Sequence, residues 1–382
     1  MNMLVFPTPA HSEAAEALRA EVRAFLRGYL EKRTPLQRSD SWNGYSAEFS
    51  RELGRRGWIG ITWPRQYGGG ERTALERYVL IEEMLAAGAP VAGHWIADRQ
   101  TGPLILKFGS EAQKRAVLPG ILAGEDFTCI GMSEPDSGSD LASVRTRAVP
   151  EQGGFRINGT KVWITNAHNA RYMILFCRTG GTAEDRHKGT SQLLVDLRTP
   201  GIEIRPIIDM AGQHHFNEVS FQNVFVPADA LLGNEGDGWR QVTSELSYER
   251  SGPERFLSSF VLLSELARAL KTSATPAAVI ALGRLTAHLV ILRRLSRSVA
   301  TLLEEGADPL VHASIVKDLG ATYEQEIPEI ARLLVDSAPG DPATGDFFAV
   351  LANVVLNAPT FSLRGGTREI LRGIIARGLG LR

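Results

Sequence analysis

The chain has 382 residues, 43% of them hydrophobic and 22% charged, which is the composition of a folded soluble protein with two or three packed regions. Lysine and arginine total 42 against 43 aspartates and glutamates, so charge gives no reason to expect nucleic acid or an anionic membrane as a partner. No segment approaches the ~20 unbroken apolar residues of a membrane span. The two cysteines, Cys129 and Cys177, make neither a disulfide framework nor a zinc site. Because the chain starts without a secretory signal pattern, we expect a cytoplasmic protein that holds no metal.

Helical periodicity dominates the first third of the chain. Apolar residues at steps of three and four predict a helix from Ser12, its expected N-cap, to about Lys32. The same pattern predicts helices over 46–56, 74–87 and 111–123. We interpret residues 1–126 as an N-terminal helical domain.

Short β-rich runs follow from about Phe127. Asn158-Gly159 lies between the first two runs, and this dipeptide favours a tight hairpin turn. The spacing predicts a middle antiparallel β-barrel or sandwich over 127–236. The expected strands are 154–157, 161–165, 172–178, 190–195, 202–207 and 218–226.

Helical periodicity returns after Gly238 and predicts a C-terminal helical bundle over 237–382. The expected fold class is therefore α+β in several parts, with helices, then strands, then helices. The expected C-terminal helices cover 239–269, 275–305, 310–337 and 347–356, and a last helix follows Thr367.

Several common catalytic motifs are missing from the sequence: Gly-x-Gly-x-x-Gly, a phosphate loop ending in Gly-Lys-Ser/Thr, His-Glu-x-x-His and Gly-x-Ser-x-Gly. The most informative stretch is instead 131–143, which reads Gly-Met-Ser-Glu-Pro-Asp-Ser-Gly-Ser-Asp-Leu-Ala-Ser. Its small and hydroxyl residues offer donors to an electron-rich ring or a phosphate. By composition alone, an ordinary polar loop is the alternative.

This stretch resembles the signature of the acyl-CoA dehydrogenase family, and the resemblance extends over essentially the whole chain. Each motif is weak alone, but their order and spacing together carry the resemblance. The other motifs are Trp63-Pro64 with Tyr67-Gly68-Gly69, Phe108-Gly109-Ser110-Glu111-Ala112-Gln113-Lys114, Asn158-Gly159-Thr160-Lys161-Val162-Trp163-Ile164-Thr165-Asn166, Val226-Pro227, and Gly365-Gly366-Thr367.

The resemblance implies a bound FAD. Met132 and Ser133 would contact the isoalloxazine ring, Trp163 would pack on its face, and Thr165 would lie near N5; a core position is the alternative for Trp163. Glu134 and Asp140 are interpreted as hydrogen-bond acceptors that hold the loop. The implied cofactor-binding residues are Ile130, Met132, Ser133, Gly138, Ser139, Trp163, Thr165, Gly366, Thr367 and Glu369.

The implied reaction removes an α-proton and a β-hydride from a CoA thioester, so it needs a carboxylate base and donors to the thioester oxygen. The family places its glutamate either just before the C-terminal Gly-Thr or on a helix within Leu-x-x-Glu-Arg. Here Gly365 stands at the first position, whereas Leu246-Ser247-Tyr248-Glu249-Arg250 carries a glutamate at the second. Glu249 is therefore the expected base, with a solvated or salt-bridged helix residue as the alternative. The backbone N–H of Gly365 is an expected donor to the thioester oxygen.

The segment 93–100 falls where the family builds the far end of the acyl pocket. Trp95 and its polar neighbours predict a short branched or ring-bearing acyl group rather than a long straight one. In the alternative, His94 and Arg99 point outward and Trp95 fills the core. The expected substrate-binding residues are Trp95, Ser139, Ser247, Tyr248 and Arg250.

The chain departs from the family pattern in two motifs that reach the FAD of a neighbouring subunit. Residues 266–286 lack the family's Arg followed by Phe-Gly and a later Gln. The family's Gln-x-x-Gly-Gly is also absent, and residues 356–361 read Leu-Asn-Ala-Pro-Thr-Phe in its place. The expected partners are an acyl-CoA substrate, an electron-transfer flavoprotein as electron acceptor, and further copies in a homodimer or homotetramer. Two other functions remain open: a flavin monooxygenase or nitroalkane oxidase on the same scaffold, and a non-catalytic subunit of a heteromeric acyl-CoA dehydrogenase.

Overall fold

A computed structural model describes residues 4–181, 185–249, 252–271, 274–336, 341–342 and 344–381, with side chains described except at 245–249. The chain divides into two compact units. Met1–Gly44, Arg72–Val91 and Ser247–Arg382 form the first unit, and Tyr45–Glu71 with Ala92–Leu246 form the second. These units cut across the three domains expected along the sequence, because the N-terminal helices are shared between them.

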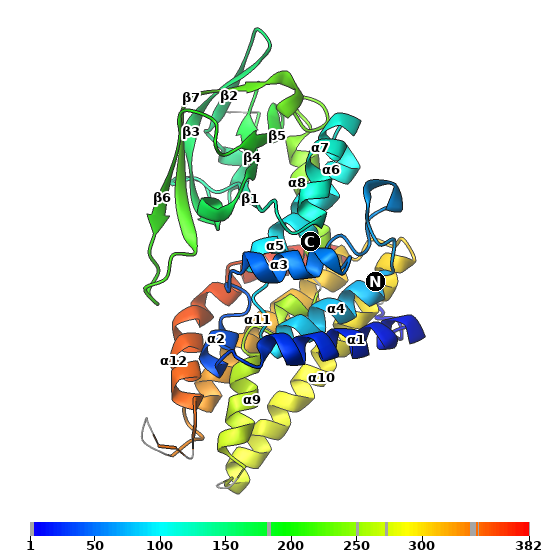
Figure 1. Ribbon diagram of the computed structural model, residues 1–382, viewed down its shortest axis with the longest axis vertical. Helices are drawn as coiled ribbons and strands as arrows, with labels where there is room; N and C mark the ends of the chain where they lie inside the picture. Colours follow the sequence, from blue (N-terminus) through cyan, green and yellow to red (C-terminus); the bar gives the residue numbers. More distant parts are fainter. Residues whose placement is uncertain are drawn as a thin grey trace. The chain divides into compact units, whose positions relative to one another are not determined.

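The first unit is helical (Figure 1). Helix α1 begins as predicted, since the Ser12 side chain accepts a hydrogen bond from the backbone N–H of Ala15. Arg19 of α1 and Arg293 of α10 each bind Glu82 of α4 with an N–O distance of 2.7 Å, so one buried carboxylate joins three helices. The helices are α1 (Glu13–Leu30), α2 (Pro35–Ser39), α4 (Ala74–Ala87), α9 (Phe260–Ala269), α10 (Pro276–Glu304), α11 (Leu310–Ala331), α12 (Phe347–Asn357) and α13 (Arg368–Gly378), with 3₁₀ turns η6 (Pro253–Arg255) and η7 (Ala358–Ser362).

Helix α10 is long, apolar and mostly exposed within the described structure. One 18-residue window has a mean hydropathy of 1.4 and is only 17% buried. By length and composition alone the helix could cross a membrane, but a single such helix is weak evidence of that, and Arg293 ties it to α4. Its exposed side chains include Val279, Ile280, Val290 and Ile291.

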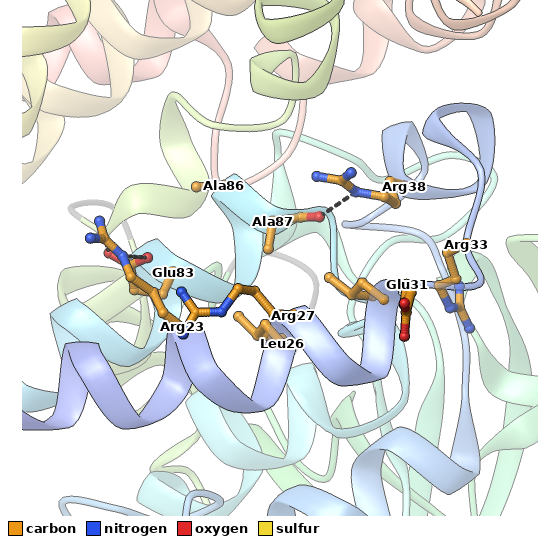
Figure 2. A pocket seen from close by; sticks show the side chains of 10 residues that line it. Arg23, Leu26, Arg27, Glu31, Arg33, Arg38, Glu83, Ala86 and Ala87 are labelled. Atoms are coloured by element: carbon orange, nitrogen blue, oxygen red, sulfur yellow. Dashed lines mark hydrogen bonds and ion pairs between the residues drawn. The ribbon is translucent and has the colours of Figure 1, made fainter.

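A basic groove of about 540 Å³ lies where α1 and α4 end (Figure 2). Leu26 and Leu30 are buried beneath it. Two of its arginines are already engaged, because Arg23 binds Glu83 and Arg38 Nε donates to the last carbonyl of α4 at Ala87. Cations at helix C-termini stabilise the exposed carbonyls there, so the groove has a structural explanation. None of the residues expected at the cofactor or substrate site lines it.

The second unit combines short helices with a curled sheet (Figure 1). In the described part of the chain seven strands form one sheet, in the order β1-β4-β2-β3-β7-β6 with β5 paired to β4. The strands are β1 (Thr128–Gly131), β2 (Arg147–Glu151), β3 (Gly154–Thr165), β4 (Tyr172–Arg178), β5 (Thr190–Asp196), β6 (Ile202–Ile207) and β7 (Phe216–Pro227). The helical elements are α3 (Ala47–Arg55), η1 (Arg65–Tyr67), α5 (Ala92–Ile96), the π-helical turn η2 (Ala97–Thr101), α6 (Gly102–Phe108), α7 (Glu111–Leu122), η3 (Leu141–Ser143), η4 (Ala167–Asn169), η5 (Ala228–Ala230) and α8 (Gly238–Glu249).

The predicted fold class is confirmed: helices precede a middle sheet, and helices follow it. The sheet is not purely antiparallel, because β1 runs parallel to β4. Two strands, β1 and β2, were not predicted. The predicted helix over 239–269 is two helices, α8 and α9, because Gly252-Pro253 interrupts the helical hydrogen bonds.

The predicted hairpin at Asn158-Gly159 is wrong. Strand β3 runs straight through this dipeptide with a register shift between Ile157 and Gly159, and the hairpin that joins β2 to β3 turns instead at Gln152-Gly153. Gly159 is needed for close approach: a Cβ there would lie 2.5 Å from the Thr146 hydroxyl. Asn158 accepts a hydrogen bond from the backbone of Asn223, which ties β3 to β7.

Candidate active site

The segment 131–143 at the end of β1, here called the signature loop, is fixed to β3 by a buried ion pair. The Lys161 ammonium, on β3, donates to Glu134 at 2.8 Å and to the carbonyl oxygen of Met132 at 2.9 Å. Glu134 also accepts from the backbone N–H groups of Arg145 and Thr146, at 2.7 and 2.9 Å. Burial favours the neutral acid, but Lys161 and these donors outweigh it and leave the pKa of Glu134 below its ordinary value. Glu134 therefore holds the loop as predicted.

Asp140 lies at the exposed end of the same loop. Its backbone carbonyl accepts from the hydroxyls of Ser137 and Ser143, and its carboxylate pairs with Arg186. These contacts fit the predicted loop-holding role.

Trp163 sits at a β-bulge in a conformation that tryptophan rarely adopts. Lys161 pairs with Val219 and Ile164 pairs with Asn217, so Val162 and Trp163 together oppose the single residue Glu218. The backbone of Trp163 has φ = 61°, in the left-handed region. Such a conformation costs about 1–3 kcal/mol in a residue other than glycine, and surrounding contacts must hold it. One of them is the bond from Val162 N–H to the Ser133 carbonyl, 2.9 Å long.

The bulge turns the Trp163 side chain away from the sheet's core. The indole is 59% exposed and meets the edge of the Phe216 ring at a centroid distance of 6.0 Å. The alternative expectation of a core position does not hold in the structure. A large exposed indole held by a strained backbone is a feature that structural stability alone does not explain.

Several residues of the signature loop and β3 are open to solvent, as contact with a bound ring system and its phosphates would require. Ser133 and Thr165 keep partly exposed side chains, and Ser139 is exposed. Gly138 borders open space, since no atom lies within 4 Å of the place a Cβ would take. The second unit therefore brings together the implied cofactor residues of the signature loop and β3: Ile130, Met132, Ser133, Gly138, Ser139, Trp163 and Thr165.

The remaining implied cofactor residues lie in the first unit, at the start of α13. Gly365 and Gly366 have φ of 72° and 100°, and Thr367 occupies the N-cap position. A Cβ on Gly365 would lie 2.8–3.0 Å from three atoms of the fully buried Arg255 guanidinium. Position 365 therefore has no room for a glutamate side chain unless Arg255 moves.

Arg255 belongs to a buried group of charges in the first unit. Its guanidinium carbon lies 5.7 Å from the centre of the Trp42 ring, and that of Arg364 lies 4.3 Å from the same ring. Arg364 is paired with the buried carboxylate of Glu324 at 3.1 Å. These contacts hold the segment before Gly365 in place.

The expected base lies at the last residue of α8, but its side chain is outside the described residues. The same holds for the side chains of Ser247 and Tyr248 and for the whole of Arg250. Glu249 as base therefore stays a prediction. Among the described residues, no group of histidine, cysteine, aspartate or glutamate side chains could hold a metal ion.

The expected pocket segment is buried in the second unit. His94, Trp95 and Arg99 are 5%, 7% and 7% exposed, so His94 and Arg99 do not point outward, whereas Trp95 is buried in the core as that alternative expects. The Arg99 guanidinium lies 5.0 Å from the centre of the Trp95 ring. Ser50 and His94 lie within hydrogen-bond distance at 3.0 Å, and burial lowers the pKa of His94 to about 4, which keeps the ring neutral.

Sequence reasoning missed three buried polar residues that shape these sites. Lys161 belongs to the motif 158–166, but no role was predicted for it. A lysine in the middle of a β-rich run indicates either an exposed face of the strand or a buried ion pair. Asn217 and Arg255 carried no signal, because their importance depends on partners far away in the sequence.

Comparisons with known proteins agree with this arrangement. The family model for the acyl-CoA dehydrogenase N-terminal domain matches residues 12–125, and the middle-domain model matches 129–224. "Acyl-CoA dehydrogenase FadE29" of Mycobacterium tuberculosis is 34% identical over 371 residues, or 94% of each chain. The solved structure "Tcur3481-Tcur3483 steroid ACAD" has a TM-score of 0.88 and 28% identity, covering 98% of this chain and 99% of that one. The ChsE4-ChsE5 complex of Mycobacterium tuberculosis has a TM-score of 0.84 and 27% identity, with 98% and 99% coverage.

The packing at Gly365 predicts that Gly365→Ala destabilises the protein by about 1–3 kcal/mol, because the backbone is left-handed and Arg255 occupies the space of the new methyl group. Urea unfolding measures the change. Gly373→Ala is the matched control: it lies within α13 with no atom closer than 3.8 Å, so its free energy of unfolding should stay the same or rise. Equal stability of the two variants would contradict the crowding at position 365.

Proposed function

We propose a reaction for this chain from the fact that it belongs to the acyl-CoA dehydrogenase family: FAD-dependent removal of the α and β hydrogens of an acyl-CoA thioester, with Glu249 as the base. Membership makes the chain an acyl-CoA dehydrogenase and a flavoprotein whose cofactor is FAD. The choice of base, the acyl group and the assembly are the parts that we add.

The crowding at Gly365 carries the assignment of the base. A glutamate beside the C-terminal Gly-Thr would need the space that the Arg255 guanidinium fills. The other family position, in Leu-x-x-Glu-Arg, holds Glu249 at the end of α8. The Gly365 position is crowded by Arg255 and carries no carboxylate, whereas the helical position carries Glu249, which supports Glu249 as the site of proton removal.

The residues of the chain then have distinct tasks in the reaction. Glu249 takes the α-proton while backbone N–H groups, that of Gly365 among them, stabilise the charge that develops on the thioester oxygen. Bound FAD supplies the acceptor for the β-hydride. Trp163 would cover the ring system of bound FAD and exclude water, and the signature loop with Thr165 would bind its polar edge. Ser247, Tyr248 and Arg250, next to the base, orient the thioester.

A second candidate function is supported by the two missing motifs at 266–286 and 356–361. The solved relatives "Tcur3481-Tcur3483 steroid ACAD" and the ChsE4-ChsE5 complex each pair two differently named proteins. This chain would then be one subunit of a heteromeric dehydrogenase, and its partner would supply the missing cofactor contacts. In either case we propose a cytoplasmic enzyme that passes electrons to an electron-transfer flavoprotein.

The assignment of the base predicts that the Glu249→Gln variant keeps its FAD. The rate at which substrate bleaches its visible flavin band should fall by at least ~10²-fold, because an amide cannot accept the proton. Anaerobic stopped-flow absorbance measures the rate. Glu329→Gln is the control, since Glu329 is exposed near the end of α11 and paired with Arg332, which follows the helix, and its rate should be normal. A normal rate in Glu249→Gln would exclude this base and make Glu245 and Glu369 the next to test.

The buried Trp95 predicts a preference for short branched or ring-bearing acyl groups, because an indole stacked on Arg99 leaves little room for a long straight chain. We expect kcat/KM for isobutyryl-CoA and cyclohexanecarbonyl-CoA to exceed that for palmitoyl-CoA. Trp95→Ala should gain activity on longer chains if the indole closes the pocket. Faster turnover of palmitoyl-CoA by the unchanged enzyme would refute this view of the pocket.

The apolar surface of α10 and α11 predicts an oligomer. Ile291 and Leu319 line a shallow groove between these helices and are 54% and 46% exposed, and covering them stabilises an assembly. Light scattering should give a mass at least twice 41.7 kDa, and Ile291→Glu with Leu319→Glu should lower it. Val149→Glu, an exposed apolar position on β2, is the control. A species of single-chain mass at micromolar concentration would refute the prediction.

A further inference from the structure

The amide of Asn217 lies next to the bulge that carries Trp163. Asn217 is completely buried on β7 and pairs with Ile164, the residue directly after Trp163. Its Nδ2 donates to the Ile164 carbonyl at 3.0 Å. Since this carbonyl can only accept, the orientation of the amide is fixed, and the Oδ1 atom faces the other way.

Two histidines converge on that oxygen. His168 Nδ1 lies 3.2 Å and His214 Nε2 lies 2.8 Å from Asn217 Oδ1. An amide oxygen cannot donate, so each ring must present an N–H to it. The other nitrogen of His168 lies 2.9 Å from the Asn169 amide, which can donate to it and so agrees with a neutral ring.

The two rings also stack on each other, with centroids 3.9 Å apart and planes 20° from parallel. They come from different segments: His168 lies on η4, just after β3, and His214 lies on the loop between β6 and β7. The backbone N–H of Asn166 donates to the His215 carbonyl at 2.9 Å, and this hydrogen bond joins the same two segments at a second point. The end of β3, directly after the bulge, is therefore held to the segment that leads into β7 by two sets of contacts.

We propose that Asn217, together with His168 and His214, is a positioning group that holds Trp163 in its left-handed backbone conformation and so sets the indole against the flavin. The proposal rests on the proposed function for the place of the flavin. It adds the buried amide and the two rings that aim the indole. These three side chains act through Trp163 and need not touch the cofactor.

The physical reason is that the strain at Trp163 must be opposed locally. Without the Asn217 amide, the Ile164 carbonyl loses a partner and the bulge can relax toward a regular pair with β7. A regular strand would rotate the side chain of residue 163 toward the opposite face of the sheet. The expected signature is thus a change at one indole, which a general loss of stability would not produce.

The first experiment follows Trp163 in the protein without FAD. The chain has six tryptophans, so labelling with 5-fluorotryptophan gives a small set of ¹⁹F resonances, and Trp163→Phe assigns the one of interest. We expect Asn217→Ala to shift or broaden this resonance. Ser191→Ala is the matched control, because Ser191 is also fully buried in the sheet but lies away from the bulge. Its hydroxyl forms hydrogen bonds with the Thr179 hydroxyl and the backbone N–H of Gly236. It should leave the Trp163 resonance unchanged.

A second variant covers the case in which Asn217→Ala fails to fold. His214→Phe keeps a ring that can stack on His168 but removes the hydrogen bond to Asn217, and it changes only a partly exposed side chain. We expect the same resonance to move in this variant. An unchanged Trp163 resonance in a folded Asn217→Ala or His214→Phe protein would overturn the proposal.

The second experiment adds FAD. In Asn217→Ala the dissociation constant for FAD should rise at least about tenfold, and quenching of flavin fluorescence should weaken, whereas Ser191→Ala should match the unchanged protein. If the Trp163 resonance moves but FAD affinity and quenching do not, the group does not position the indole for the flavin. Failure of the unchanged protein to bind FAD would contradict the proposed function itself and would be seen before any variant is made.

Discussion

The arrangement around Trp163 depends on the buried ion pair between Lys161 and Glu134. This pair joins the signature loop to the middle of β3, and the next residue along β3 donates to the same loop at Ser133. Removing one partner would leave a charge buried without its counter-ion, which typically costs about 3–5 kcal/mol. The pair therefore makes the loop and the bulge one structural feature, and the two motifs that imply cofactor contacts cannot move independently.

Much of the fold could be predicted from the sequence, because helix caps and periodicity are local. Ser12 caps α1 as predicted, α10 begins within one residue of its predicted start at Thr275, and β4 and β6 have the predicted bounds. The failures are also physical. Asn158-Gly159 has the local preference of a hairpin, but the pairing of β3 with β7 continues on both sides of it, and the glycine serves close packing against Thr146.

The candidate site was predictable where a residue acts through its own chemistry and not where it acts through a distant partner. Trp163 and the loop around Ser133 could be selected from motifs, and the structure exposes the indole as a cofactor surface requires. The left-handed backbone of Trp163, the Asn217 amide next to it and the Arg255 guanidinium against Gly365 arise from contacts between segments far apart in the sequence. The last of these leaves little space for any side chain at position 365 unless Arg255 moves.

We propose that this chain, loaded with FAD, removes one hydrogen each from the α and β carbons of a CoA thioester. The most direct measurement is anaerobic mixing of the FAD-loaded protein with branched and ring-bearing acyl-CoA thioesters, with absorbance and mass spectrometry recorded on the same samples. We expect loss of the visible flavin band in step with formation of a thioester product lighter by two hydrogens. An oxidised flavin beside an unchanged thioester across the whole panel would contradict it, as would a colourless protein that takes up no FAD.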